Sequence, residues 1–133
     1  IAKYSNGPVI VEYGQAWRED IALSGAKVGL KHRGCATAYY GGAKKMPCDI
    51  HLFSDAENDC FRPDIQSPLN GLQDFPVVDL LFKNFAPKSG IVLDPMCGMG
   101  YTAKAAIKYN LTFYGNELNS KRLEKTVMKL ENQ

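Results

Sequence analysis

Residues 89–118 read SGIVLDPMCGMGYTAKAAIKYNLTFYGNEL, a pattern that predicts a strand, a glycine turn, a helix and a second strand. The β-branched run at 91–93 is typical of a short buried parallel strand, and Asp94-Pro95 ends its pairing. Gly98 and Gly100 can adopt backbone angles that other residues avoid, so a ligand can approach the main chain there. The stretch therefore predicts a βαβ unit with a ligand-binding turn.

The second half of this stretch completes a predicted nucleoside site. Residues 101–109 predict a helix whose alanines pack closely on the sheet and whose N-terminal amides point into the turn. Residues 111–114 predict the second strand. Glu117 follows it, about 20 residues beyond the glycines, where a βαβ nucleotide site places a carboxylate for the ribose hydroxyls. We therefore expect these residues to form half of a nucleoside-binding site.

The whole chain has the composition of one small domain. Its 133 residues are 45% hydrophobic, which is enough for a real core. No run approaches the roughly 20 apolar residues of a membrane span, and the N-terminus lacks the basic-then-apolar order of a signal peptide. Four cysteines without a CxxC pair indicate reduced thiols. We therefore expect a soluble, cytoplasmic protein that does not enter a membrane.

Charged residues are segregated along the chain, although the net charge is only +2. Residues 21–47 hold five basic side chains and no acid, whereas residues 49–64 hold five acids and one arginine. The lysines could neutralise phosphates while Tyr39 and Tyr40 stack on unpaired bases. A solvated ribbon with its tyrosines in the core explains the same pattern, so both interpretations stay open.

Before the βαβ unit, periodicity predicts a strand at 8–13, a short helix at 15–23, a hairpin or irregular ribbon at 25–42, and a strand at 49–53. The short helix is expected to bury Trp17, Ile21 and Leu23 in part. Residues 54–71 are polar and contain two prolines, which predicts a loop or linker.

Two further helices flank the βαβ unit. Residues 75–85 carry one apolar stripe, with Pro76 in the first turn and Pro87 beyond the end. After Glu117, Asn119 or Ser120 can cap a last helix whose apolar residues share one face: Leu123, Val127 and Leu130.

The stretch from Phe75 to Leu130 resembles the cofactor-binding half of S-adenosylmethionine-dependent methyltransferases, particularly the amino-group (N6-adenine/N4-cytosine) DNA methyltransferases. In that family an Asp-Pro-aromatic-x-Gly-x-Gly turn surrounds the methionine end of the cofactor, and residues 94–100 match it except that Met96 replaces the aromatic. Glu117 resembles the carboxylate that binds the ribose. The resemblance implies S-adenosylmethionine as cofactor, with these cofactor-binding residues: Phe75, Pro76, Asp94, Pro95, Met96, Cys97, Gly98, Gly100 and Glu117.

The resemblance also implies a fold and a partner. The expected fold is α/β, a Rossmann-like methyltransferase sheet that is partial in this chain, with a less regular basic N-terminal segment. Residues 1–72 would then be the nucleic-acid-contacting part and residues 73–133 the cofactor-binding unit. DNA is the expected partner, and a homo-oligomer is compatible with the sequence.

The catalytic residues are unknown, because the family's Asp/Asn/Ser-Pro-Pro-aromatic motif for the target amino group is not found. Ser67-Pro68-Leu69-Asn70 comes nearest, but it lacks the second proline and the aromatic, and a loop Ser-Pro explains it better. The position of the cofactor motif near the C-terminus resembles the permuted class, in which the catalytic motif lies upstream.

Four alternatives stay open. The chain could be a non-catalytic cofactor-binding or regulatory module, or a methyltransferase for RNA or a small molecule. Residues 98–103 also fit the dinucleotide pattern G-x-G-x-x-A, although Asp94-Pro95 before the glycines favours the methyltransferase turn. A glycine-rich turn that holds no ligand is the last alternative.

Two cysteine patterns bear on other chemistry. His32-Arg-Gly-Cys35 and Cys48-Asp-Ile-His51 lie about 12 residues apart, and four such ligands could close a zinc site. A surface histidine with buried thiols is the preferred interpretation, so no metal is expected. Cys97 has no histidine nearby in sequence, and we expect it to line the cofactor pocket rather than act as a nucleophile.

Overall fold

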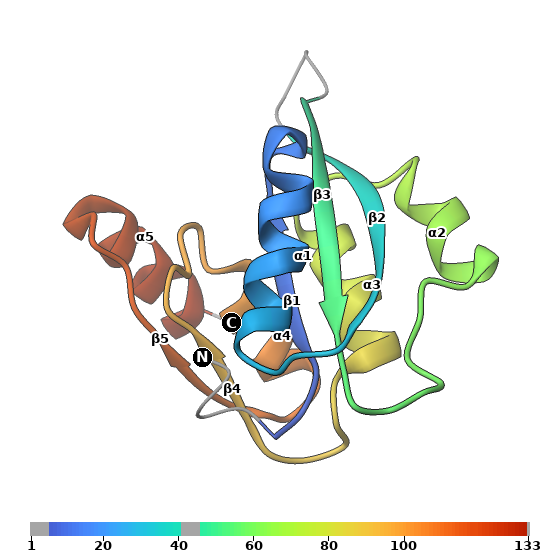
Figure 1. The fold of residues 1–133 in the computed structure, drawn as a ribbon. Coiled ribbons are helices and arrows are strands. Elements are labelled where there is room, and N and C mark those ends of the chain that lie inside the picture. Colours follow the sequence, from blue (N-terminus) through green and yellow to red (C-terminus); the bar gives the residue numbers. More distant parts are fainter. Residues whose placement is uncertain (1–5, 41–45, 133) are drawn as a thin grey trace. The chain divides into compact units, whose positions relative to one another are not determined.

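The structure is a computed structural model that describes residues 6–40 and 46–132 (Figure 1). Its contacts divide the chain into two compact units, Ile1–Ala86 and Pro87–Gln133. Within the described ranges, no helix combines the length and the hydropathy needed to cross a membrane.

A three-stranded antiparallel sheet forms the centre of the first unit. Its order is β1 (Val9–Tyr13), β3 (Met46–Phe53), β2 (His32–Tyr40), with β3 between the other two. The register places Val11 and Cys35 on either side of His51. The remaining elements of this unit are η1 (Gln15–Trp17), α1 (Arg18–Lys27), α2 (Pro63–Leu69) and α3 (Phe75–Phe85).

The core of the first unit lies on one face of this sheet. Side chains alternate along β3, so Ile50 and Leu52 share a face and are fully buried. Helices α2 and α3 cover that face, whereas α1 lies on the other, as Figure 1 shows. The core residues are Ala36, Ala38, Ile50, Leu52, Ile65, Leu69, Val77, Leu81 and Phe85.

The second unit is the predicted βαβ unit followed by a helix. β4 (Ile91–Asp94) pairs in parallel with β5 (Thr112–Gly115), and α4 (Tyr101–Lys108) connects them. Three alanines of α4 are buried as predicted: Ala103, Ala105 and Ala106. The last helix is α5 (Ser120–Glu131), whose N-cap is Asn119; the Asn119 side chain accepts a hydrogen bond from the Arg122 amide at 3.1 Å.

The structure corrects the loop prediction for residues 54–71. Residues 63–69 form α2, because Pro63 suits the first turn and Ile65 and Leu69, spaced i, i+4, both enter the core. The loop prediction holds only for the residues before Pro63 and after Leu69. Gly41 and Gly42, at the end of the predicted ribbon, lie outside the described residues.

Several predicted buried side chains are exposed. Trp17 of η1 and Leu23 of α1 are 54% and 60% exposed, whereas Ile21 is half-buried as predicted. Ile91 and Leu93 are also exposed, and β4 is therefore not the buried strand expected from its composition. On α5, Leu123 and Val127 are exposed and Leu130 is half-buried. The buried residue of this helix is Thr126.

Candidate functional site

The candidate site is the tight turn between β4 and α4. The Asp94 carboxylate accepts a hydrogen bond from the Met96 amide at 3.0 Å, and the Gly100 amide donates to the Cys97 carbonyl at 2.8 Å. Gly98 and Gly100 have φ angles of +49° and +79°, which side chains other than glycine rarely adopt. The aspartate and both glycines therefore each have a geometric role in shaping the turn.

Two elements that follow in the chain hold this turn. The Cys97 amide donates to the Asn116 carbonyl at 2.9 Å, and the Asn116 amide donates to the Asp94 carbonyl at 3.0 Å. The Thr126 hydroxyl of α5 donates to the Gly98 carbonyl at 3.0 Å. These bonds connect the turn to the end of β5 and to α5, so its backbone is fixed before any ligand binds.

Glu117 lies beside the glycines. One of its carboxylate oxygens accepts a hydrogen bond from the Asn119 amide at 2.9 Å. The other, Oε2, is 3.8 Å from the point that a Cβ on Gly98 would occupy. The structure thus brings the acidic residue after β5 to the turn after β4, although the two are separated by a helix in sequence.

The other predicted cofactor residues have different environments. Pro95 and Met96 are exposed, Met96 at 79%, whereas Cys97 is buried. Phe75 and Pro76 begin α3 in the first unit, with Phe75 half-buried and Pro76 exposed. Their cofactor-binding role stays a prediction.

We expect Cys97 to react slowly with alkylating reagents. Burial, reinforced by the Asp94 and Glu117 carboxylates, raises the pKa of its thiol, and the thiolate is the reactive form. Peptide mass spectrometry after a timed iodoacetamide pulse at pH 7 should show labelling of Cys97 about tenfold slower than labelling of the less buried Cys60. Faster labelling of Cys97 would indicate an activated nucleophile and contradict its assignment as a lining residue.

The basic segment forms internal contacts in the first unit. Arg33 donates to the Ser54 carbonyl at 2.8 Å and to the Asp55 carbonyl at 3.2 Å. The Tyr40 hydroxyl donates to Glu12 at 2.5 Å, and its ring packs against the core. Arg33 and Tyr40 therefore have structural roles. Lys27 and Lys31 are exposed, and the Lys31 ammonium lies 3.8 Å from the Asp55 carboxylate.

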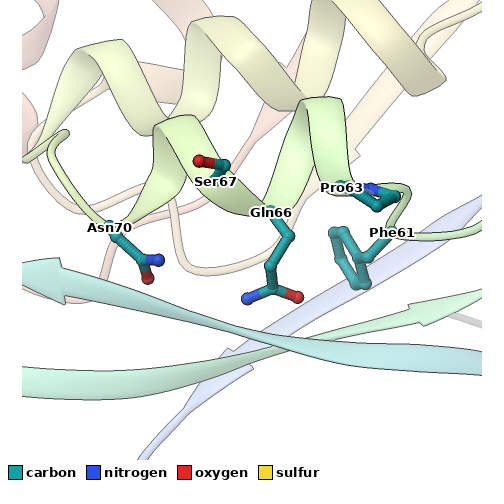
Figure 2. A pocket seen from close by; sticks show the side chains of 5 residues that line it. All are labelled: Phe61, Pro63, Gln66, Ser67 and Asn70. Carbon is teal, nitrogen blue, oxygen red and sulfur yellow. The ribbon is translucent and has the colours of Figure 1, made fainter.

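Ser67 and Asn70, the ends of the nearest match to a catalytic motif, line a shallow hollow along α2 (Figure 2). Figure 2 shows Ser67 on the helix, with Gln66 and Asn70 directed toward the strands below. Ser67 belongs to α2 itself, and no strand precedes it directly. The expected loop is therefore wrong, since Ser67 and Pro68 lie within α2.

The proposed four-ligand zinc set is not brought together. Cys48 packs against the core with Ile50, on the face of the sheet opposite to His51. His51 is fully buried, so the preferred interpretation of surface histidines is wrong for it, although it is right for His32.

Thr126 and Asn116 were not anticipated from sequence. Asn116 acts only through its backbone, which gives no side-chain signal. Thr126 could have been found, because it lies three residues after Leu123 and four before Leu130, on the same face of α5. A polar residue at such a position indicates a specific hydrogen bond.

Part of the chain, including the candidate site, matches a known protein family. Residues 75–128 match the family described as DNA methylase. The match begins at the Phe75-Pro76 pair and includes the glycine turn and Glu117. It confirms the resemblance to amino-group DNA methyltransferases. Curated protein sequences give no match to the chain.

Solved structures extend the DNA methylase likeness to the fold of nearly the whole chain. The M1.HpyAVI structure aligns with a TM-score of 0.77 and 16% identity, over 94% of this chain and 75% of that one. The M1.HpyAVI–SAM complex aligns at 0.72 and 13%, over 93% and 74%. TTHA0409 from Thermus thermophilus, a proposed DNA modification methylase complexed with S-adenosyl-L-methionine, aligns at 0.71 and 14%, over 95% and 70%. The predicted Rossmann-like α/β methyltransferase fold is confirmed.

Proposed function

We propose that this protein is an S-adenosylmethionine-dependent methyltransferase that methylates a base amino group in DNA. The observation that carries the proposal is the position of the Glu117 carboxylate beside the positive-φ Gly98, inside the region that matches the DNA methylase family. Two structurally similar proteins were crystallised in complex with the same cofactor.

The residues of the turn suit the chemical groups of S-adenosylmethionine. The cofactor carries an ammonium, a carboxylate, a sulfonium and a ribose diol. The carboxylates of Asp94 and Glu117 suit its cationic and diol groups, whereas backbone amides at the start of α4 suit its carboxylate. Gly98 and Gly100 keep side-chain atoms away from the main chain where the ligand would approach.

The bound cofactor would supply an electrophilic methyl group on sulfur. In the proposed reaction the amino nitrogen of the base attacks that methyl in line, so an N–C bond forms, the S–C bond breaks, and the nitrogen loses a proton. Positioning of the two reactants would supply most of the rate. The chain's contribution at the turn is to hold the cofactor in one orientation.

The two parts of the chain have separate proposed roles. Residues 73–133 would bind the cofactor. Residues 1–72 would contact DNA, and the exposed Lys27 and Lys31 are suited to phosphates. We place the reaction in the cytoplasm, and light scattering of the purified protein with and without DNA would report whether it forms a homo-oligomer.

Glu117→Gln is expected to raise the dissociation constant for S-adenosylmethionine about tenfold to a hundredfold. The variant keeps the shape of the side chain but removes the charge that strengthens hydrogen bonds from a ribose diol. Isothermal calorimetry measures this change. Glu124→Gln, on the exposed surface of α5, is the matched control and should bind as the unaltered chain does. Equal affinity of both variants for S-adenosylmethionine would mean that Glu117 does not contact the cofactor.

Transfer of a labelled methyl group to unmethylated DNA tests the activity itself. Binding of S-adenosylmethionine without transfer would favour the non-catalytic module. Transfer to RNA but not to DNA would support the RNA methyltransferase alternative. Calorimetric binding of NAD in place of S-adenosylmethionine would instead support the dinucleotide alternative.

A further inference from the structure

Three metal-ligating side chains meet on the face of the first unit's sheet that carries α1. Asp49 and His51 lie on the same face of β3, and Cys35 lies opposite His51 on β2. The ligand atoms of all three lie within 4.8 Å of one another. This cluster is separate from the glycine turn, since it belongs to the other compact unit.

The distances within this cluster suit a tetrahedral ion. His51 Nε2 lies 3.9 Å from Cys35 Sγ and 4.0 Å from Asp49 Oδ2. Bonds of about 2.0–2.3 Å from zinc to nitrogen, oxygen and sulfur give tetrahedral edges of roughly 3.4–3.8 Å. Contraction by a few tenths of an ångström would therefore bring His51 Nε2 to coordination distance from both partners. The Cys35 and Asp49 ligand atoms, which lie within 4.8 Å of each other, would approach by at most about 1 Å.

A second set of side chains orients the first. His51 Nδ1 and His32 Nε2 are 3.0 Å apart, so one donates a hydrogen bond to the other. If His51 Nδ1 donates, the lone pair of His51 Nε2 faces Cys35 and Asp49. Arg18 fixes the Asp49 carboxylate with two bonds, at 2.7 and 2.8 Å. Metal-binding histidines and carboxylates are usually held by such outer partners.

The burial of two of the three ligands agrees with this geometry. The Asp49 and His51 side chains are both 0% exposed, which is costly for polar groups without strong partners.

We propose that Cys35, Asp49 and His51 bind one divalent transition-metal ion, with His32 and Arg18 as positioning residues. A thiolate, an imidazole and a carboxylate match zinc best among the common ions. The site joins the two strands β2 and β3 beneath α1. It differs from the set suggested by sequence spacing, because Asp49 replaces Cys48, whose side chain faces the core.

Cobalt(II) is the probe for this site, since it adopts zinc geometry and its thiolate bond gives a near-ultraviolet charge-transfer band. Titration of the chelator-treated chain should reach saturation at one ion per chain with this band present. Cys35→Ser should abolish the band. The control is Cys48→Ser, which changes the residue next to Asp49 on β3 and should retain the band. Asp49→Asn should raise the cobalt dissociation constant at least tenfold.

The wild-type titration is decisive even if a variant fails to fold. No saturable cobalt spectrum at one equivalent would overturn the proposal and leave the cluster as a hydrogen-bonded network around Arg18 and Asp49. A charge-transfer band that survives Cys35→Ser but disappears in Cys48→Ser would overturn it equally. Circular dichroism of each variant confirms that folded protein is being compared, and thermal unfolding with added zinc should give a higher midpoint.

Discussion

Gly100→Ala is expected to destabilise the protein by about 2–5 kcal/mol and to raise the dissociation constant for S-adenosylmethionine at least tenfold. Two costs add. The φ angle of +79° costs a side-chain-bearing residue about 1–2 kcal/mol. The new Cβ would also lie 2.5 Å from Thr126 Cγ2, and overpacking typically costs about 1–3 kcal/mol. Urea unfolding and calorimetry measure the two effects.

Substitutions at two other glycines distinguish the backbone cost from the cost of the clash. Gly98→Ala meets the same backbone restriction, at φ +49°, but its new Cβ would have only ordinary contacts, so about 1–2 kcal/mol is expected. Gly14→Ala, at φ −60° and with only one side-chain atom near the new Cβ, should be nearly neutral.

The clash itself can be relieved. Thr126→Ser removes the crowded Cγ2 but keeps the hydroxyl that donates to the Gly98 carbonyl, so it should recover part of the stability lost by Gly100→Ala. Additive losses in the double variant would mean that Thr126 does not press on the turn.

The glycine-turn unit was predictable because its signals are local. A β-branched run, an Asp-Pro stop and paired glycines each restrict the backbone within a few residues of themselves. The helix at 75–85 and the Asn119 cap were predicted for the same reason. Glu117 required one longer step, namely that the carboxyl ends of adjacent parallel strands lie at the same edge.

The failures concern contacts between distant segments. α2 has only Ile65 and Leu69 to indicate burial, and their partners are on β2, β3 and α3. Ile91 and Leu93 were predicted to be buried because they are apolar, but they are exposed. The burial of a strand depends on which segments cover it, and these are distant in sequence. The Arg18–Asp49 pair spans 31 positions in sequence and joins residues with no shared motif.

The metal-ligating cluster shows how register decides between candidate sites. Spacing alone grouped His32, Cys35, Cys48 and His51, because each histidine lies three residues from a cysteine. In a strand, residues three apart lie on opposite faces, so Cys48 and His51 cannot act together once β3 is extended. Asp49 takes the position beside His51 because residues two apart share a face.

Ile50→Ala is expected to destabilise the protein by about 3 kcal/mol, within the 2–5 kcal/mol range for deletion of a buried isoleucine side chain. Ile50 is 0% exposed at the centre of the middle strand and packs with residues of α2 and α3. The loss combines the transfer of apolar atoms with a cavity that three surrounding elements cannot easily fill. Urea denaturation followed by circular dichroism measures the free energy of unfolding.

Ile10→Ala is the matched control, because it deletes the same atoms from the same sheet. Ile10 lies on β1 opposite Leu52 and is 37% exposed, so its truncation should cost less than about 1 kcal/mol. The loss of β-propensity is common to both variants, and the difference between them therefore measures burial alone. Equal losses of stability in the two variants would contradict the difference in burial between Ile10 and Ile50.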